Sequence, residues 1–133
     1  MALDLDSMME RSDEIWEQSI LPSLSDFIEI KALSPLFEPK WADLGELDAT
    51  IGLFCEWLDE QGIEGMSYET HRIGNLSPVL LVTIDGTGAG EVIFYSHLDK
   101  QPSKPDLWSE GLHPLHAVRR DPWLYGRGSV DDG

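Results

Sequence analysis

The sequence predicts an α/β fold in which two amino-terminal helices are followed by the strands of a mixed sheet. Apolar residues recur at helical spacing in two segments of the first half, residues 7–32 and 41–61. Two nearly uninterrupted apolar runs follow, at residues 78–84 and 92–95, and such runs are typical of strands buried on both faces. A chain of 133 residues is long enough to form one domain with its own core.

The first predicted helix covers residues 7–32. Its apolar stripe consists of Met8, Ile15, Leu21, Leu24, Phe27 and Ile28. Pro22 lacks a backbone donor and clashes with the preceding turn, so we expect it to kink or divide this helix. Two prolines within residues 34–39 then predict a loop, because they oppose both helix and strand.

The second predicted helix covers residues 41–61, and Gly62 is its expected C-cap. Its apolar residues recur at steps of three and four and so predict a core face: Leu44, Leu47, Ile51, Phe54, Trp57 and Leu58. Cys55, the only cysteine, excludes an internal disulfide and is expected to be a small buried side chain.

The strand region begins with residues 66–73, where His71 is expected at an edge or on the surface. A turn at residues 74–75 leads into a buried strand at 78–84, since proline is tolerated at a strand's start. A central buried strand, Val92–Tyr95, follows the glycine-rich connection 85–90. Short strands are expected near residues 117–120 and 123–125, on either side of an Asp-Pro turn.

The central strand delivers His97 and Asp99 to its carboxyl end, where open α/β folds place their ligands. Residues two apart in an extended chain project to the same side. One imidazole nitrogen could therefore face a metal ion while the carboxylate accepts a hydrogen bond from the other nitrogen. The same pair could instead be a structural hydrogen bond without a metal, so the spacing alone leaves both interpretations open.

A second acidic element closes the chain. Asp131 and Asp132 follow the turn Gly126-Arg127-Gly128, whose glycines allow a close backbone approach to a ligand. Two adjacent carboxylates suit an oxygen contribution to a metal site, although such a pattern alone is more often an ordinary turn. The occurrence of both elements on one short chain favours the metal hypothesis.

Two further histidines, His113 and His116, are three residues apart. Pro114 between them opposes a helix, so their side chains need not share a face. We expect them at the surface or at the rim of a substrate site.

Taken together, these elements resemble a known family, the co-catalytic zinc metallopeptidases that include aminoacylases, acetylornithine deacetylases, glutamate carboxypeptidases and dipeptidases. The matching elements, in the family's order, are His97-Leu98-Asp99-Lys100-Gln101-Pro102, Trp108 and Leu124-Tyr125-Gly126-Arg127-Gly128-Ser129-Val130-Asp131-Asp132-Gly133. The resemblance covers essentially the whole chain. It implies that residues 1–133 are the amino-terminal part of a phosphorylase/hydrolase-like catalytic domain, truncated inside the active-site region and without a lid or dimerisation domain.

The resemblance also implies roles for individual residues. His97 would be a metal ligand, Asp99 the catalytic-site carboxylate that orients it, and Asp131 the carboxylate bridging two divalent ions. Those ions would be Zn²⁺, with Co²⁺ or Mn²⁺ as alternatives. In the family, the peptide bond that corresponds to Asp131-Asp132 is often cis.

The expected reaction is hydrolysis of an amide bond in a dipeptide or an N-acyl amino acid. The family's general-base glutamate and remaining metal ligands follow the Asp-Asp element, and these 133 residues do not include them. We therefore expect activity from a full-length protein, in which a homodimer is an option, and none from this fragment alone.

The charge and apolar content of the chain argue against some classes of partner. The net charge of −16 argues against nucleic acid, since phosphate contacts need clustered Lys and Arg. Residues 1–60 carry 15 acidic and 3 basic side chains, so the acidity belongs to the helices and most simply solvates their outer faces. No apolar run approaches the ~20 residues that span a bilayer, and the acidic amino terminus is unlike a signal peptide, which predicts a cytoplasmic protein without membrane contact.

A second function hypothesis belongs to a different class. The chain could be a non-catalytic or truncated module that keeps the fold and works as an interaction surface. A Glu-Glu pair and a later histidine in a longer coding region would favour the enzyme.

Overall fold

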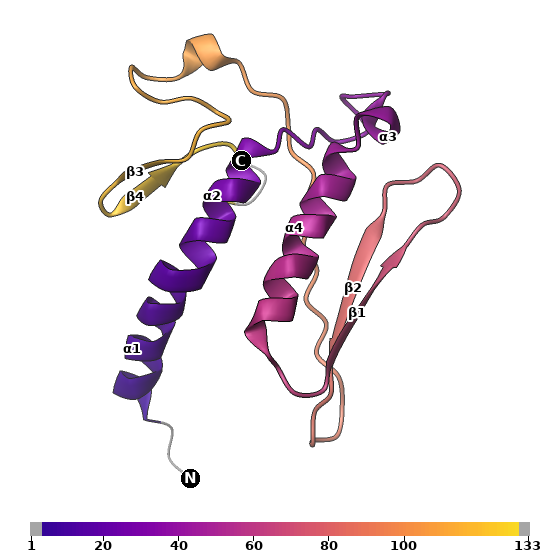
Figure 1. The fold of residues 1–133 in the computed structure, drawn as a ribbon, viewed down its shortest axis with the longest axis vertical. Coiled ribbons are helices and arrows are strands. Elements are labelled where there is room, and N and C mark those ends of the chain that lie inside the picture. Colours follow the sequence, from indigo (N-terminus) through magenta and orange to yellow (C-terminus); the bar gives the residue numbers. More distant parts are fainter. Residues whose placement is uncertain (1–3, 131–133) are drawn as a thin grey trace.

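A computed structural model describes residues 4–130 of the chain. It has a mixed α/β architecture, with a long helical column, a second long helix beside it and two separate antiparallel hairpins (Figure 1). Each hairpin is a two-stranded sheet of its own. The predicted mixture of helices and strands is confirmed, but residues 4–130 do not form the predicted mixed sheet.

The helical column contains α1 (Leu5–Ile15), a π-helical turn η1 (Trp16–Ile20) and α2 (Leu21–Glu29). Asp4 caps α1 by accepting a hydrogen bond from the Ser7 N–H at 3.3 Å. Pro22 lies in the first turn of α2, directly after the π turn. A wider turn at this point accommodates the proline, so the predicted division takes the form of a π-helical insertion.

The second predicted helix is interrupted near its start. α3 (Trp41–Leu44) ends at Gly45, which has a left-handed φ of 68°, and α4 (Glu46–Gln61) begins directly after it. Gly62 terminates α4 with a φ of 59°, which confirms the expected C-cap.

The core lies where α2 and α4 pack against each other. Its buried apolar residues are Phe27, Ile28, Ala32, Leu47 and Ile51. The rings of Phe27 and Phe54 meet edge to face with centroids 5.7 Å apart. Nearer the other end of the pair, the Trp57 indole Nε1 donates a hydrogen bond to the Ser19 hydroxyl at 2.9 Å. Cys55 is only partly buried, which differs from the expected full burial.

The first hairpin consists of β1 (Met66–His71) and β2 (Val79–Ile84), in a register that pairs Met66 with Ile84. Tyr68 anchors it to α4 by donating a hydrogen bond to the Asp59 carboxylate at 2.7 Å. β2 is not the buried strand that the sequence predicted: Val79 is 57% exposed and Ile84 55%. β2 pairs only with β1, and within residues 4–130 no second layer covers its outer face.

The prediction of a central buried strand at Val92–Tyr95 is wrong for the described structure. The segment is in no strand ladder, and the side chains of Phe94 and Tyr95 are each 92% exposed. Burial on both faces requires neighbouring strands and two covering layers. The strands within residues 4–130 pair as two hairpins, and neither offers an edge that the segment uses.

The end of the chain matches its prediction more closely. A short 3₁₀ helix, η2 (Pro105–Leu107), precedes the second hairpin of β3 (Val118–Arg120) and β4 (Trp123–Tyr125). Arg119 ties this hairpin to the helical column through two hydrogen bonds to the Glu17 carboxylate, at 2.6 and 2.8 Å. Among residues 4–130, no helix has the length and apolar character needed to cross a membrane.

Candidate functional site

The His97–Asp99 pair has the geometry that its spacing predicted. The imidazole Nδ1 lies 3.1 Å from Asp99 Oδ1 and 3.0 Å from the Asp99 backbone oxygen. Both side chains are 31% exposed, so the pair is partly shielded and still reachable from solvent. The two side chains do meet, although the strand expected to carry them is absent.

This geometry determines the tautomer of His97. Both oxygens near Nδ1 are acceptors when Asp99 is ionised, so Nδ1 must carry the hydrogen. In the neutral ring the lone pair then lies on Nε2. A histidine that binds a metal ion through Nε2 commonly donates Nδ1–H to a carboxylate in this manner.

Lys100 fixes the segment that follows the pair to the end of α2. Its backbone N–H donates to Ala32 O at 2.8 Å, and its carbonyl accepts from Ser34 N at 2.9 Å. Its side chain is buried, with a residue exposure of 2%. Burial lowers the pKa of Lys100 to about 8, while the nearby charge of Glu46 acts in the opposite direction.

The glycine turn that precedes Asp131 packs on the same helix end. A Cβ on Gly126 would lie 2.5 Å from Ile28 Cγ2, and a Cβ on Gly128 would lie 2.8 Å from Phe27 Cε1. Gly128 also has a φ of 95°, which other residues rarely adopt. Both glycines are therefore required for the turn to approach α2 this closely.

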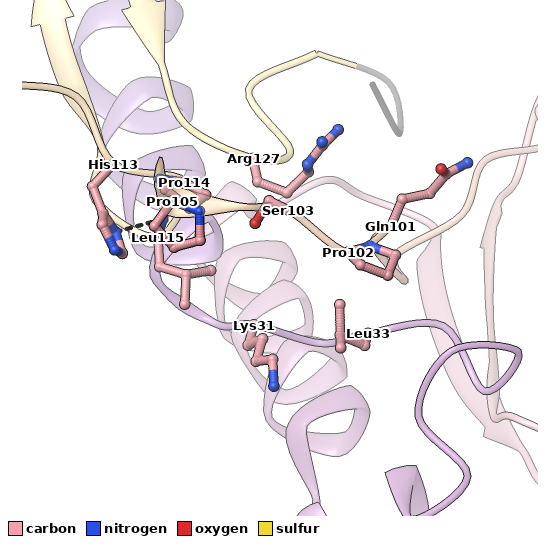
Figure 2. Close-up of a pocket in the computed structure, with 10 residues that line it drawn as sticks. All are labelled: Lys31, Leu33, Gln101, Pro102, Ser103, Pro105, His113, Pro114, Leu115 and Arg127. Atoms are coloured by element: carbon pink, nitrogen blue, oxygen red, sulfur yellow. Dashed lines mark hydrogen bonds between the residues drawn. The ribbon is translucent and has the colours of Figure 1, made fainter. Parts of the chain in front are cut away.

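A small pocket opens where these segments converge, with a volume of about 160 Å³. Its wall combines the loop after α2, the residues after Asp99, the approach to β3 and the glycine turn (Figure 2). The lining residues are Lys31, Leu33, Gln101, Pro102, Ser103, Pro105, His113, Pro114, Leu115 and Arg127. The turn is held there by a hydrogen bond from the Arg127 N–H to Pro114 O at 2.7 Å.

The other three histidines line the pocket or lie at the surface. His113 lines the pocket, and its Nδ1 accepts a hydrogen bond from the Leu115 N–H at 3.1 Å (Figure 2). His116 is exposed, and its ring stacks on that of His113 with centroids 4.4 Å apart, so these two side chains meet although Pro114 separates them. His71 is exposed as predicted and lies 3.0 Å from the Glu69 carboxylate.

Two of the three side chains predicted for a metal site, His97 and Asp99, lie among the described residues. His97 and Asp99 fit the roles of a ligand and its orienting carboxylate, whereas Asp131 lies outside the described residues. Within residues 4–130, no three or more His, Cys, Asp or Glu side chains gather as a metal-binding group. A divalent ion at His97 would therefore need carboxylates from elsewhere.

Sequence reasoning missed Lys100 as part of this region. A lysine in a polar loop is usually exposed, and only its position directly after the His-x-Asp element could have suggested otherwise.

Comparison with models of known protein families finds none that matches the chain, and comparison with curated proteins also finds no match. An assignment of function therefore depends on the motif residues and on their local geometry.

Proposed function

We propose that the chain contributes to the catalytic centre of a metal-dependent amide hydrolase that resembles the co-catalytic zinc metallopeptidases. The substrate would be a dipeptide or an N-acyl amino acid. In this proposal His97 and Asp131 hold the metal ions, Asp99 orients His97, and other residues complete the ligand set. The single observation that carries the proposal is the contact between His97 Nδ1 and the Asp99 carboxylate at 3.1 Å.

In this proposal, Asp99 and the two glycines of the turn each have a specific role. Asp99 keeps the hydrogen of His97 on Nδ1 and makes Nε2 more basic. Gly126 and Gly128 let the turn before Asp131 lie against the end of α2, which Lys100 also contacts. A bound pair of divalent ions, Zn²⁺ in the first instance, would supply Lewis-acid activation of water and of the amide carbonyl.

The pocket beside this region suits a small substrate group. Its volume of about 160 Å³ is enough for a few heavy atoms, and its wall combines prolines and leucines with Lys31 and Arg127. A substrate with a small, largely apolar side chain would match that lining.

The test is to measure amine release from a panel of dipeptides and N-acetyl amino acids by the full-length protein loaded with Zn²⁺. Hydrolysis should disappear on chelation and return on adding Zn²⁺. His97→Ala and Asp131→Ala should each lower it to background, while His71→Ala, which changes an exposed histidine paired with Glu69, should leave it unchanged. Hydrolysis that survives chelation and both substitutions would reject the proposal.

A second candidate function is an interaction module, and one observation favours it. The apolar run Val92–Tyr95 is 80 to 92% exposed and makes no strand pairing, so its backbone could pair with a partner's strand. Absence of both Zn²⁺ binding and hydrolysis, together with protection of these amides from hydrogen exchange by a partner, would favour this candidate.

A further inference from the structure

We propose that Lys100 is a positioning residue, whose buried ammonium fastens the His97–Asp99 segment to the carboxyl end of α2 and so maintains the orientation of His97. The inference rests on the proposed function, because the orientation matters most if His97 binds a metal ion. Lys100 would touch neither substrate nor metal, and it would act through its neighbours.

The Lys100 ammonium lies among three backbone carbonyl oxygens. Nζ donates to the carbonyl oxygens of Phe27, Ile28 and Ile30, at 2.5, 3.3 and 2.6 Å. Phe27 and Ile28 lie in the last turn of α2 and Ile30 is its C-cap. The Phe27 carbonyl also accepts from the Ile30 N–H at 3.2 Å, and the last carbonyls of a helix lack the usual helical donors four residues later. A cation is also favourable at this end of a helix, because the helix dipole places negative charge there.

The shape of the site explains why a lysine is needed. An ammonium offers three rotatable donors, and here three carbonyls surround it. Nζ also lies 4.0 Å from the centroid of the Phe27 ring, a cation–π contact. An arginine fork is planar and bulkier, so it would not reproduce the three contacts of the compact ammonium.

The position of Lys100 in the sequence connects its buried ammonium to the His97–Asp99 pair. Asp99 immediately precedes it, and the Lys100 backbone is held on both sides by the loop after α2, through Ala32 and Ser34. The Asp99 backbone oxygen is itself one of the two acceptors near His97 Nδ1. A shift of the Lys100 backbone would therefore move both oxygens that orient the imidazole.

The glycine turn rests on the same side chain. A Cβ on Gly128 would lie 3.0 Å from Lys100 Cε, which places the turn directly against the lysine stem. Lys100 therefore connects three segments on whose relative positions the proposed metal site depends. These are the end of α2, the His97–Asp99 segment and the turn that leads to Asp131.

The test compares full-length wild type with Lys100→Met, which keeps an unbranched side chain of nearly the same length and removes its donors. Nitrogen chemical shifts of the His97 ring report its tautomer without any metal. Wild type should show the hydrogen on Nδ1, and Lys100→Met should show a mixture of tautomers. The affinity for Zn²⁺, measured by competition with a chromophoric chelator, should fall about 10-fold or more, as expected when a ligand loses its orientation.

Trp57→Leu is the matched control, because it breaks the contact between Trp57 and Ser19 and weakens the helix pair away from the loop. It should lower the unfolding midpoint and leave the His97 tautomer and the Zn²⁺ affinity unchanged. Lys100→Met with a wild-type tautomer would overturn the inference and leave Lys100 a purely structural cap. A wild type that shows the Nδ1–H tautomer but binds no Zn²⁺ would instead count against the proposed function.

A measurement on wild type keeps the inference testable if Lys100→Met does not fold. An ammonium bonded to three carbonyls should give a slowly exchanging Lys100 resonance in nitrogen-detected spectra. A resonance exchanging as fast as that of an exposed lysine would contradict the anchor and overturn the inference.

Discussion

At the residue scale, Lys100 couples folding to pH. Its pKa falls to about 8 in the folded state from an ordinary value of 10.5, mainly because burial disfavours the charge. Between these two values the unfolded chain binds more protons at this site than the folded chain does. The contribution of Lys100 to the free energy of unfolding is therefore constant below pH 8 and rises with pH from about 8 to 10.5.

We predict that the free energy of unfolding of wild type, relative to that of Lys100→Met, increases between pH 8 and pH 10.5. Urea unfolding at the two pH values measures this difference. Cys55 and Tyr68, whose pKa values are raised, contribute in the opposite direction, but they are present in both proteins and cancel in the comparison. A difference that does not change with pH would show that Lys100 titrates normally.

The glycine turn gives a second prediction at this scale. Gly128→Ala should destabilise the fold by about 1–3 kcal/mol, because the new methyl group meets the Phe27 ring at 2.8 Å and the backbone has a φ of 95°. Gly52→Ala is the control: it lies within α4 with nothing near its added Cβ, and it should stabilise by up to about 1 kcal/mol. Equal urea midpoints for the two variants would contradict the close approach of the turn to α2.

The contacts of single residues also show what the spacing of residues in the sequence can predict. The contact between His97 and Asp99 was predictable, because side chains two apart in an extended segment project to one side. The burial of Lys100 was not, because it depends on the end of a helix about 70 residues earlier in the chain. Tertiary contacts of that kind leave no local pattern in the sequence.

At the element scale, one ion pair connects the second hairpin to the helical column. Arg119 in β3 holds Glu17 in η1 and lowers the pKa of that carboxyl, chiefly through their hydrogen bonds. Both side chains are substantially exposed, so added salt should screen the attraction.

We predict a small coupling between Glu17→Gln and Arg119→Met in a double-mutant cycle of unfolding free energy, and a smaller coupling at high salt. Arg72→Met removes an exposed ion pair between Arg72, which directly follows β1, and Asp48 in α4. This substitution should show no coupling to Glu17→Gln. A Glu17–Arg119 coupling that does not respond to salt would contradict an exposed ionic link.

Helices were easier to predict than strands, for a physical reason. Each predicted apolar stripe defines a core face within one segment, and the structure buries Phe27 and Ile28 of the first stripe and Leu47 and Ile51 of the second. The prediction fails at the start of each stripe, where Met8 is 52% and Leu44 50% exposed. Whether an apolar run such as Val92–Tyr95 becomes a buried strand depends on distant partners. Residues 4–130 do not provide those partners. The apolar composition of Val92–Tyr95 therefore led to a wrong prediction of its burial.

At the scale of the whole molecule, the chain exposes much more surface than a compact monomer does. Its accessible area is 10253 Å² for a mass of 14.9 kDa, whereas a typical folded monomer of that mass exposes about 7,000 Å². Much of the excess is apolar, on β2 and on Val92–Tyr95. Such surface favours contacts with another chain or segment and promotes association.

We therefore predict self-association that depends on protein concentration, measured by light scattering. Phe94→Ser should reduce it, because Phe94 is 92% exposed within a continuous apolar run. Leu36→Ser removes an 81% exposed leucine from a proline-containing loop and should have little effect. Equal effects of the two substitutions would locate the association elsewhere.

We infer that Asp99 orients His97 to bind a divalent metal ion, and a Zn²⁺ competition titration measures that binding. The full-length proteins compared are wild type, His97→Ala, Asp99→Asn and the control His71→Ala. We expect His97→Ala to remove high-affinity binding, Asp99→Asn to weaken it by about 10- to 100-fold, and His71→Ala to leave it unchanged. Affinities that are the same for wild type, His97→Ala and Asp99→Asn would contradict the claim.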